Sequence, residues 1–338
     1  MGRDQKAGAL MLPALAIALV AGIVLSFGLG RYPISPGELG GMLLAKIAPI
    51  EKFWTPQMET VLFNVRLPRI LLACMVGCCL ASAGAAYQGI FQNPMASPDI
   101  LGASAGAAFG AALAILLGLD SRMVTVLAFA GSLVTVGLVW LVGRFAKGKQ
   151  VMSMILAGIM VSSLFQAGTS YIKLVADPTN QLPAITYWLM GSLSGAKAAD
   201  VAFLLGPMAL GLVPLMLLRW KMNLLTLGDE EARTMGVNAG RLRLVTVLSA
   251  TLLTAAAVAV SGTIGWVGLV VPHLARKLVG NNFRRLMPAS MLLGALFLVV
   301  VDDVSRNLLA TEIPLGILTA LVGAPFFLWL ILRRGERL

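Results

Sequence analysis

Long apolar stretches alternate with short polar segments along the whole chain, and the polar segments hold nearly all of the charged residues. A transmembrane α-helix needs about 20 mostly apolar residues. Cutting the chain at charged residues and at Gly/Pro clusters leaves about ten such stretches. We therefore expect an all-α membrane protein that forms a single transmembrane domain over residues 1–338. The predicted spans are 8–30, 66–91, 98–118, 123–143, 150–173, 200–219, 242–261, 264–280, 286–308 and 314–333.

Glycine and proline refine this pattern at three places. The run from Leu244 to Ala275 carries no charge and is too long for one crossing, so we expect a break at Gly262 or Gly265. The sequence Ser-Pro-Gly-Glu at residues 35–38 matches a capping box, which predicts a short surface helix over residues 36–47. Glycines spaced four residues apart predict one helix face in close contact with a neighbour. They are Gly102, Gly106 and Gly110.

Composition and charge support a membrane protein and set its orientation. Hydrophobic residues make up 58% of the chain and charged residues 12%, which is more apolar surface than a water-soluble domain can bury. With the amino terminus in the cytoplasm, 17 of the 26 lysines and arginines lie on the cytoplasmic side, as the positive-inside rule requires. An even number of spans then places both termini in the cytoplasm.

The net charge of +11 and the three cysteines point to no further chemistry. Basic residues occur one to three at a time between apolar runs and form no continuous stripe, so we expect no nucleic-acid partner. Cys74, Cys78 and Cys79 share one apolar segment, where we interpret them as small packing residues. No His/Cys/carboxylate cluster has metal-ligand spacing, so we predict no metal site, no cofactor and no catalytic residue.

Ionisable side chains are nearly absent from the middle of the predicted spans. His273 is the exception, and Asp302 and Asp303 lie near the outer end of the ninth span. Ion-coupled carriers keep such groups at mid-membrane depth to bind the coupling ion. The chain also has no G-x-x-x-x-G-K-[ST] loop for nucleotide phosphates. We therefore predict a transporter whose energy source is another polypeptide, and we interpret His273 as a structural hydrogen-bonding residue rather than a ligand.

The longest cytoplasmic connection, residues 221–240, reads as a short helix that lies across the inner surface. Thr226 and Asp229 match a capping box, and Gly236 fits a C-terminal stop. Two interpretations are equally good: a solvated connector, or a helix whose apolar side chains bind in a groove on a partner. Those side chains are Leu227, Ala232 and Met235.

A series of short motifs follows in order along nearly the whole chain. They are RLPR at 66–69, QGIFQNPMASPDILG at 88–102, WLMGS at 188–192, LGDEEARTMG at 227–236, GWVGLVVPHLAR at 265–276, IPLG at 313–316 and GAPFF at 323–327. This series resembles that of the FecCD-type permeases, which serve importers of iron siderophores, haem and cobalamin. The resemblance implies a ten-span, multi-pass protein of the bacterial cytoplasmic (inner) membrane.

The resemblance also implies partners and assigns residues to them. A second permease subunit, most simply in a homodimer, would enclose the pathway, with two cytoplasmic ATP-binding subunits below it and an extracytoplasmic substrate-binding protein above. The resemblance assigns docking of the binding protein to Arg66 and Arg306. Asp302 lies four residues before Arg306, so an intrachain ion pair is the alternative for that arginine. The residues assigned to ATPase coupling are Leu227, Gly228, Asp229, Glu230, Glu231, Ala232, Arg233, Met235 and Gly236.

The cytoplasmic gate of the family maps to two positions in the chain. Asn93 and Met95 follow the second span, and Val151 and Met152 open the fifth. The last two lack the hydroxyl groups found in the cobalamin permease, which disfavours cobalamin as substrate. We expect a ferric siderophore or haem. Cobalamin and a molybdate-type oxyanion are alternatives for the same machinery, and a stand-alone secondary transporter is the alternative from a different class. Arg69 is expected to extend its guanidinium to the lipid headgroups.

Overall fold

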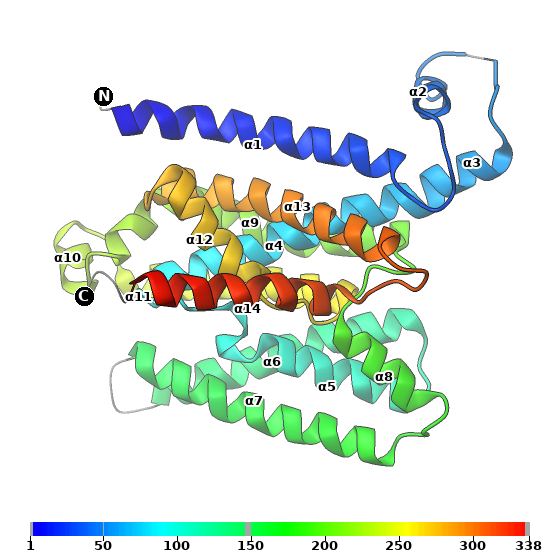
Figure 1. Cartoon of the computed structure of the whole chain (residues 1–338). Coiled ribbons are helices and arrows are strands. Elements are labelled where there is room, and N and C mark those ends of the chain that lie inside the picture. Colours follow the sequence, from blue (N-terminus) through cyan, green and yellow to red (C-terminus); the bar gives the residue numbers. More distant parts are fainter. Residues whose placement is uncertain (1–2, 50, 146–149, 335–338) are drawn as a thin grey trace.

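The computed structural model describes residues 3–49, 51–145 and 150–334, and every regular element in these ranges is a helix (Figure 1). A π-helix, η1 (Val61–Arg66), continues directly into the fourth α-helix, and a 3₁₀ turn, η2 (Pro98–Leu101), precedes the fifth. The α-helices are α1 (Arg3–Gly28), α2 (Pro36–Leu44), α3 (Pro56–Thr60), α4 (Leu67–Ile90), α5 (Ala103–Leu116), α6 (Ser121–Phe145), α7 (Gln150–Val175), α8 (Gln181–Met190), α9 (Ala198–Leu225), α10 (Asp229–Thr234), α11 (Ala239–Ser261), α12 (Val267–Val279), α13 (Phe283–Asn307) and α14 (Leu315–Arg334).

The predicted spans coincide with helices, and the all-α prediction is confirmed. Among the residues described, seven helical stretches are long and apolar enough to cross a membrane. Six of them lie in α1, α6, α7, α9, α11 and α13, and the seventh covers α3, η1 and α4. Three predicted spans are occupied by shorter helices. Of these, α5 has 14 residues, α12 has 13, and α14 has an apolar core over Leu315–Leu330.

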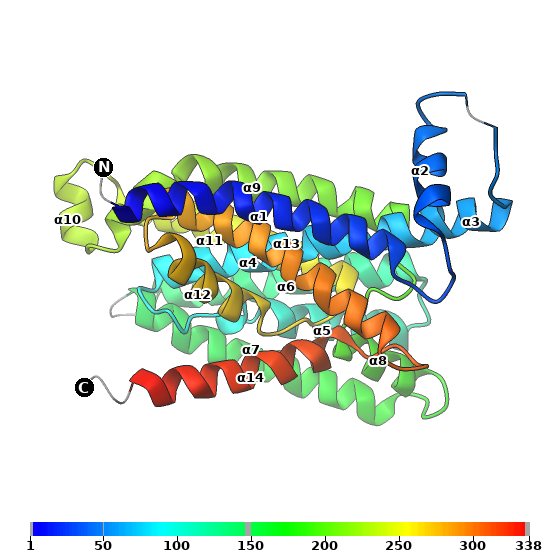
Figure 2. The same cartoon turned by 45° about the horizontal axis from the view of Figure 1, so that its top comes forward.

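The long helices run side by side, and the two ends of the bundle differ (Figures 1 and 2). The first turn of α1 and the last turn of α14 lie at the end that holds α10, whereas α2, α3 and α8 lie at the opposite end. We refer to these as the α10 end and the α2 end. Helix α4 lies at the centre of the bundle. In the apolar stretch that contains α4, 89% is buried, compared with 11% in that of α1 at the periphery.

Glycine allows the central helices to approach each other closely. A Cβ atom at Gly77 would lie 2.2 Å from the Gly294 carbonyl oxygen, and one at Gly84 would lie 1.8 Å from that of Gly268. The predicted glycine face of α5 is confirmed in the same way, since a Cβ at Gly106 would lie 2.3 Å from the Gly131 carbonyl oxygen of α6. Small residues therefore set the interhelical distance, as expected for membrane helices.

Replacing Gly84 with alanine should destabilise the bundle, because the new methyl group meets backbone that cannot move aside. We expect a loss of about 1–3 kcal/mol of unfolding free energy. Thermal unfolding in detergent measures it. The control is Gly206→Ala in α9, where nothing lies within 4 Å of the added Cβ. That change should stabilise by about 0.5–1 kcal/mol, and equal stability of the two variants would contradict the close contact.

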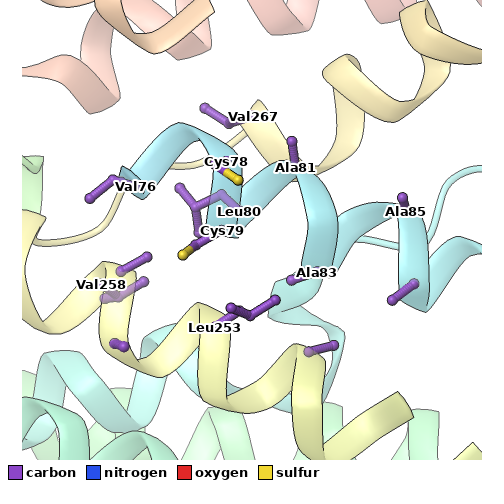
Figure 3. Close-up of a cluster of buried hydrophobic side chains, with 14 of the residues drawn as sticks. Val76, Cys78, Cys79, Leu80, Ala81, Ala83, Ala85, Leu253, Val258 and Val267 are labelled. Atoms are coloured by element: carbon purple, nitrogen blue, oxygen red, sulfur yellow. The ribbon is translucent and has the colours of Figure 1, made fainter. Parts of the chain in front are cut away.

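The cysteines of α4 are packing residues, as predicted. All three are free thiols, and Cys78 and Cys79 are buried. Figure 3 shows both in a cluster with Leu80, Leu253 and Val258, which come from α4 and α11.

The predicted turns are also present, although one helix was missed. Ser35 and Glu38 form the capping box of α2 through bonds in both directions, with Ser35 N donating to Glu38 Oε2 at 2.8 Å. Helix α11 ends at Ser261, where Gly262 has a φ of +69°, so the expected break is confirmed. The predicted spans leave residues 174–199 as a connection, but α8 lies within them. Its ten residues are too short to be recognised as a span.

Candidate functional site

A surface cavity of about 560 Å³ lies where three of the sequence motifs meet. Its lining has one hydroxyl group, on Thr263, and no charged side chain among the described residues. The lining residues are Leu189, Met190, Thr263, Gly265, Trp266, Gly316, Ile317, Ala320 and Leu321. They come from the end of α8, the turn before α12 and the first half of α14. Such a surface can let a large solute pass without binding it tightly.

Backbone hydrogen bonds hold these three segments together. The Leu315 N–H donates to the Gly191 carbonyl oxygen at 2.8 Å, and the Ser192 N–H donates to that of Ser261 at 2.8 Å. Gly316 lies so close to α8 that an added Cβ would be 2.5 Å from the Met190 carbonyl oxygen. The cavity wall is thus built from glycine-containing turns that are distant in sequence. The motifs are recognisable as contiguous strings, but nothing local in them shows that they meet at a cavity.

A buried charge cluster joins α4 to α13 and to the loop before α14. Arg69 Nε lies 3.0 Å from both carboxylate oxygens of Asp302, and Arg69 Nη1 lies 2.8 Å from Glu312 Oε1. The expectation that Arg69 extends to the lipid headgroups is therefore wrong, because two carboxylates hold its guanidinium inside the protein. Burial acts to raise the pKa of Glu312, but hydrogen bonds and charge from Arg69 outweigh it, so this pKa lies below its ordinary value.

Arg306 extends the same cluster towards α1. Its guanidinium donates to the Ser26 carbonyl oxygen at 2.9 Å and contacts the Asp303 carboxylate, while its Nε lies 3.8 Å from Asp302 Oδ2. The intrachain ion pair considered from sequence is therefore present. Ser26 also donates to Asp303 Oδ1 at 2.7 Å. The cluster thus links α1, α4 and α13 at the α2 end of the bundle.

Arg66 is buried next to this cluster and bonds to backbone. Its guanidinium donates to the carbonyl oxygens of Phe27, in the last turn of α1, and of Tyr32, in the loop that follows α1. Arg66 is 4% exposed and Arg306 is 7% exposed. Direct contact of either arginine with a partner carboxylate would require it to leave its present partners.

The predicted connector helix is present as α10, with a different start. Gly228, at φ +130°, is its N-cap, and Thr226 instead donates its hydroxyl to the Asn223 carbonyl oxygen at 2.6 Å. The Thr226–Asp229 capping box is therefore wrong: α9 continues to Leu225, so Thr226 caps its end. The Asp229 side chain lies outside the described residues. Gly236, at φ +78°, fits the predicted stop.

The apolar side chains of the connector divide between two surfaces. Leu227 and Met235 are 60% and 57% exposed, whereas Ala232 is fully buried. Ala232 packs with Leu225 and Leu242 in a small cluster between α9 and α11. The prediction of Ala232 as an anchor for a partner is therefore wrong, because it attaches α10 to its own chain. Leu227 and Met235 are available to a partner.

The predicted gate residues lie at the α10 end. Asn93 Oδ1 accepts a hydrogen bond from the Met95 backbone N–H at 2.9 Å, which closes a tight turn after α4. Met95 and Met152 are both exposed in the single chain. The Val151 side chain lies outside the described residues.

His273 is buried in an aromatic environment. Its ring centroid lies 5.9 Å from that of Phe326 and 6.2 Å from that of Phe327, both on α14. Nowhere in the described ranges do three or more His, Cys, Asp or Glu side chains gather in a group that could hold a metal ion.

Comparisons with known proteins agree on one family. The family model described as the FecCD transport family matches residues 18–333. The molybdate import system permease protein MolB of Haemophilus influenzae is 41% identical over 95% of each chain. The hemin transport system permease protein HmuU of Yersinia pestis is 42% identical over 83% of this chain and 85% of its own. A solved structure of a metal-chelate type ABC transporter in an inward-facing conformation has a TM-score of 0.85 and 40% identity, covering 96% of this chain and 99% of that one.

Proposed function

This chain belongs to the FecCD transport family, and from that membership we propose that it is the permease subunit of a binding-protein-dependent ABC importer. The observation that carries the proposal is the structural match to a metal-chelate type ABC transporter over 96% of the chain. The chain would form the translocation pathway, and ATP hydrolysis by separate subunits would supply the energy.

We place the protein in the bacterial cytoplasmic membrane with about ten spans and both termini in the cytoplasm. The first turn of α1 and the last turn of α14 both lie at the α10 end, which supports this topology (Figure 1). The short helices α5 and α12 would complete their crossings with the segments that precede them, the 3₁₀ turn η2 before α5 and the turn at residues 262–266 before α12, because backbone that is not α-helical is tolerated where protein buries it. The α10 end is then cytoplasmic and the α2 end faces outward.

A second copy of the chain would complete the pathway. The apolar cavity beside α8 and α14 is open in one chain, and much of α7 and α14 is exposed, including Leu164, Tyr171, Leu321 and Leu328. Two such surfaces that face each other across a two-fold axis would enclose a channel with uncharged walls. Selection among substrates would then fall mainly to the binding protein.

We assign coupling to the ATPase to the connector within residues 221–240. Its exposed side chains Leu227 and Met235 suit a groove on the partner, and the buried Ala232 transmits force to α9 and α11. Closure of the ATPase pair would tilt these helices as rigid bodies and open the gate formed by the turn at Asn93 and by the start of α7, where Val151 and Met152 lie. The acidic residues Asp229, Glu230 and Glu231 and the basic Arg233 would set the charge of the contact.

Arg66 and Arg306 remain part of the proposed docking surface for the binding protein, with an indirect role. They hold the backbone at the outer ends of α1 and α13, so they shape the surface from below. Exposed charges above them, such as Arg31, would meet the partner first.

The substrate we propose is a metal chelate, either a ferric siderophore or haem, and no resident metal or cofactor is needed. The structural relative and the haemin permease support this class. Molybdate is the second candidate, because the relative MolB, which matches 95% of the chain, is a permease of a molybdate import system. Cobalamin stays a third possibility for the same machinery.

Reconstitution in proteoliposomes with the cognate ATPase and binding protein tests both mechanism and substrate. Four ligands would be loaded in turn onto the binding protein: a ferric siderophore, haem, cobalamin and molybdate. We expect one of them to stimulate ATP hydrolysis and to be taken up. Uptake should stop without ATP or without the ATPase. Uptake by the isolated chain along an ion gradient would instead favour a secondary carrier and overturn the proposal.

A further inference from the structure

Helix α4 ends in a tight turn that places glutamine where glycine is usual. The Asn93 N–H donates to the Gln88 carbonyl oxygen at 3.2 Å and the Gln92 N–H to that of Gly89 at 3.4 Å, which is a Schellman pattern. Gln92 has a φ of +49°, and Trp266 is the one other non-glycine residue with positive φ in the described ranges. The left-handed conformation disfavours side chains other than glycine. A strained glutamine here indicates a function for its side chain.

The Gln92 amide reaches the base of the connector. Its Nε2 donates to the Leu225 carbonyl oxygen at 2.5 Å, across 133 positions in sequence. Leu225 is the last residue of α9 and lies three positions before Gly228, the N-cap of α10. It is buried in the cluster that holds Ala232, so it moves with α10.

On its other side, Gln92 is continuous with the gate turn. Asn93 follows it directly and binds the Met95 N–H through its side chain. Gln88, one turn earlier, donates to the Leu269 carbonyl oxygen at 3.2 Å and accepts from Arg276 of α12. The end of α4 and the gate turn are therefore bonded to α12 through Gln88 and to the end of α9 through Gln92.

We propose that Gln92 is a positioning residue that couples the gate to the ATPase through its hydrogen bond to the Leu225 carbonyl oxygen. The proposal rests on the assignment of the chain as an ABC permease. When the ATPase moves α10, the end of α9 moves with it, and the Gln92 amide transmits that displacement to Asn93 and Met95. Without this donor the connector still moves, but less of its displacement reaches the gate.

Substitutions at Gln92 can separate this role from a purely structural one. Gln92→Gly removes the amide and also relieves the strained φ, so it should leave thermal stability equal or higher. Gln92→Met keeps the length and the strain but has no donor, whereas Gln92→Lys keeps a donor of similar reach. The matched control is Gln181→Ala, because Gln181 makes the same kind of bond, to the Leu116 carbonyl oxygen at 3.0 Å, at the α2 end.

The readout is the accessibility of the gate, which needs no knowledge of the substrate. Met95→Cys would be introduced into the full complex, and its labelling by a membrane-impermeant maleimide followed from the cytoplasmic side. Labelling rates are compared without nucleotide and with ATP and vanadate trapped in the ATPase. The chain without this substitution gives the background from Cys74, Cys78 and Cys79.

We expect trapping to change the labelling rate in the Met95→Cys chain and in the Gln181→Ala control. Gln92→Gly and Gln92→Met should reduce that change about two- to tenfold, the factor that one neutral hydrogen bond corresponds to. Gln92→Lys should retain most of it. An undiminished response in both Gln92→Gly and Gln92→Met would overturn the proposal. A complex without ATP-driven uptake, before any Gln92 substitution, would instead overturn the function on which it rests.

Discussion

Arg69→Leu should destabilise the folded protein by about 3–5 kcal/mol, because it leaves a buried carboxylate without its main partner. Asp302 is 1% exposed, and Arg69 supplies three of its contacts, at 2.9 to 3.0 Å. Arg306, 3.8 Å away through its Nε, cannot replace them without leaving Asp303 and Ser26. Thermal or denaturant unfolding in detergent measures the loss.

Two further variants make this prediction specific. Changing both residues, in Arg69→Leu with Asp302→Leu, should recover much of the stability, since the fully buried carboxylate is removed with its partner and Glu312, whose side chain is 27% exposed, can be hydrated instead. Lys52→Leu breaks an exposed ion pair with Glu59 at 3.2 Å and should cost less than about 1 kcal/mol. If Arg69→Leu unfolds like the unmodified chain, the cluster does not stabilise the outer ends of α4 and α13.

Gly236→Val should uncouple ATP hydrolysis from transport while the protein still inserts into the membrane. Gly236 has a φ of +78°, which costs a side-chain-bearing residue about 1–2 kcal/mol. Helix α10 has six residues and cannot hold its shape without that turn. A penalty of this size corresponds to about a 5- to 30-fold loss of the docking-competent connector. The number of substrate molecules taken up per ATP hydrolysed should fall accordingly.

Asparagine at the same position provides the control. Asn tolerates the left-handed conformation, and nothing lies within 4 Å of a Cβ added at Gly236, so Gly236→Asn should keep near-normal coupling. Comparing Gly236→Val with Gly236→Asn therefore distinguishes backbone strain from a steric clash of the added side chain. Normal coupled uptake in Gly236→Val would show that the cap of α10 does not matter for coupling.

The errors made from sequence have a common cause. Arg69 was expected at the headgroups, but its partners Asp302 and Glu312 lie 233 and 243 positions away, and no local pattern links them. The Thr226–Asp229 box is wrong because α9 continues to Leu225, the residue directly before the expected N-cap. Ala232 was assigned to a partner because a short amphipathic segment does not reveal which side its own chain covers. Each error concerns a contact, and none concerns the identity of a long helix.

The helical membrane class, the order of the long helices and the family are all readable from the sequence alone. The length of an apolar stretch is a local property that can be compared directly with the thickness of a bilayer, and the motifs are contiguous strings. Three features follow only from the fold: the pairing of the buried charges, the meeting of motifs at the cavity, and the hydrogen bond from the Gln92 amide to α9. These depend on the approach of helices more than a hundred positions apart, and packing sets that approach through glycine contacts such as Gly84 with Gly268.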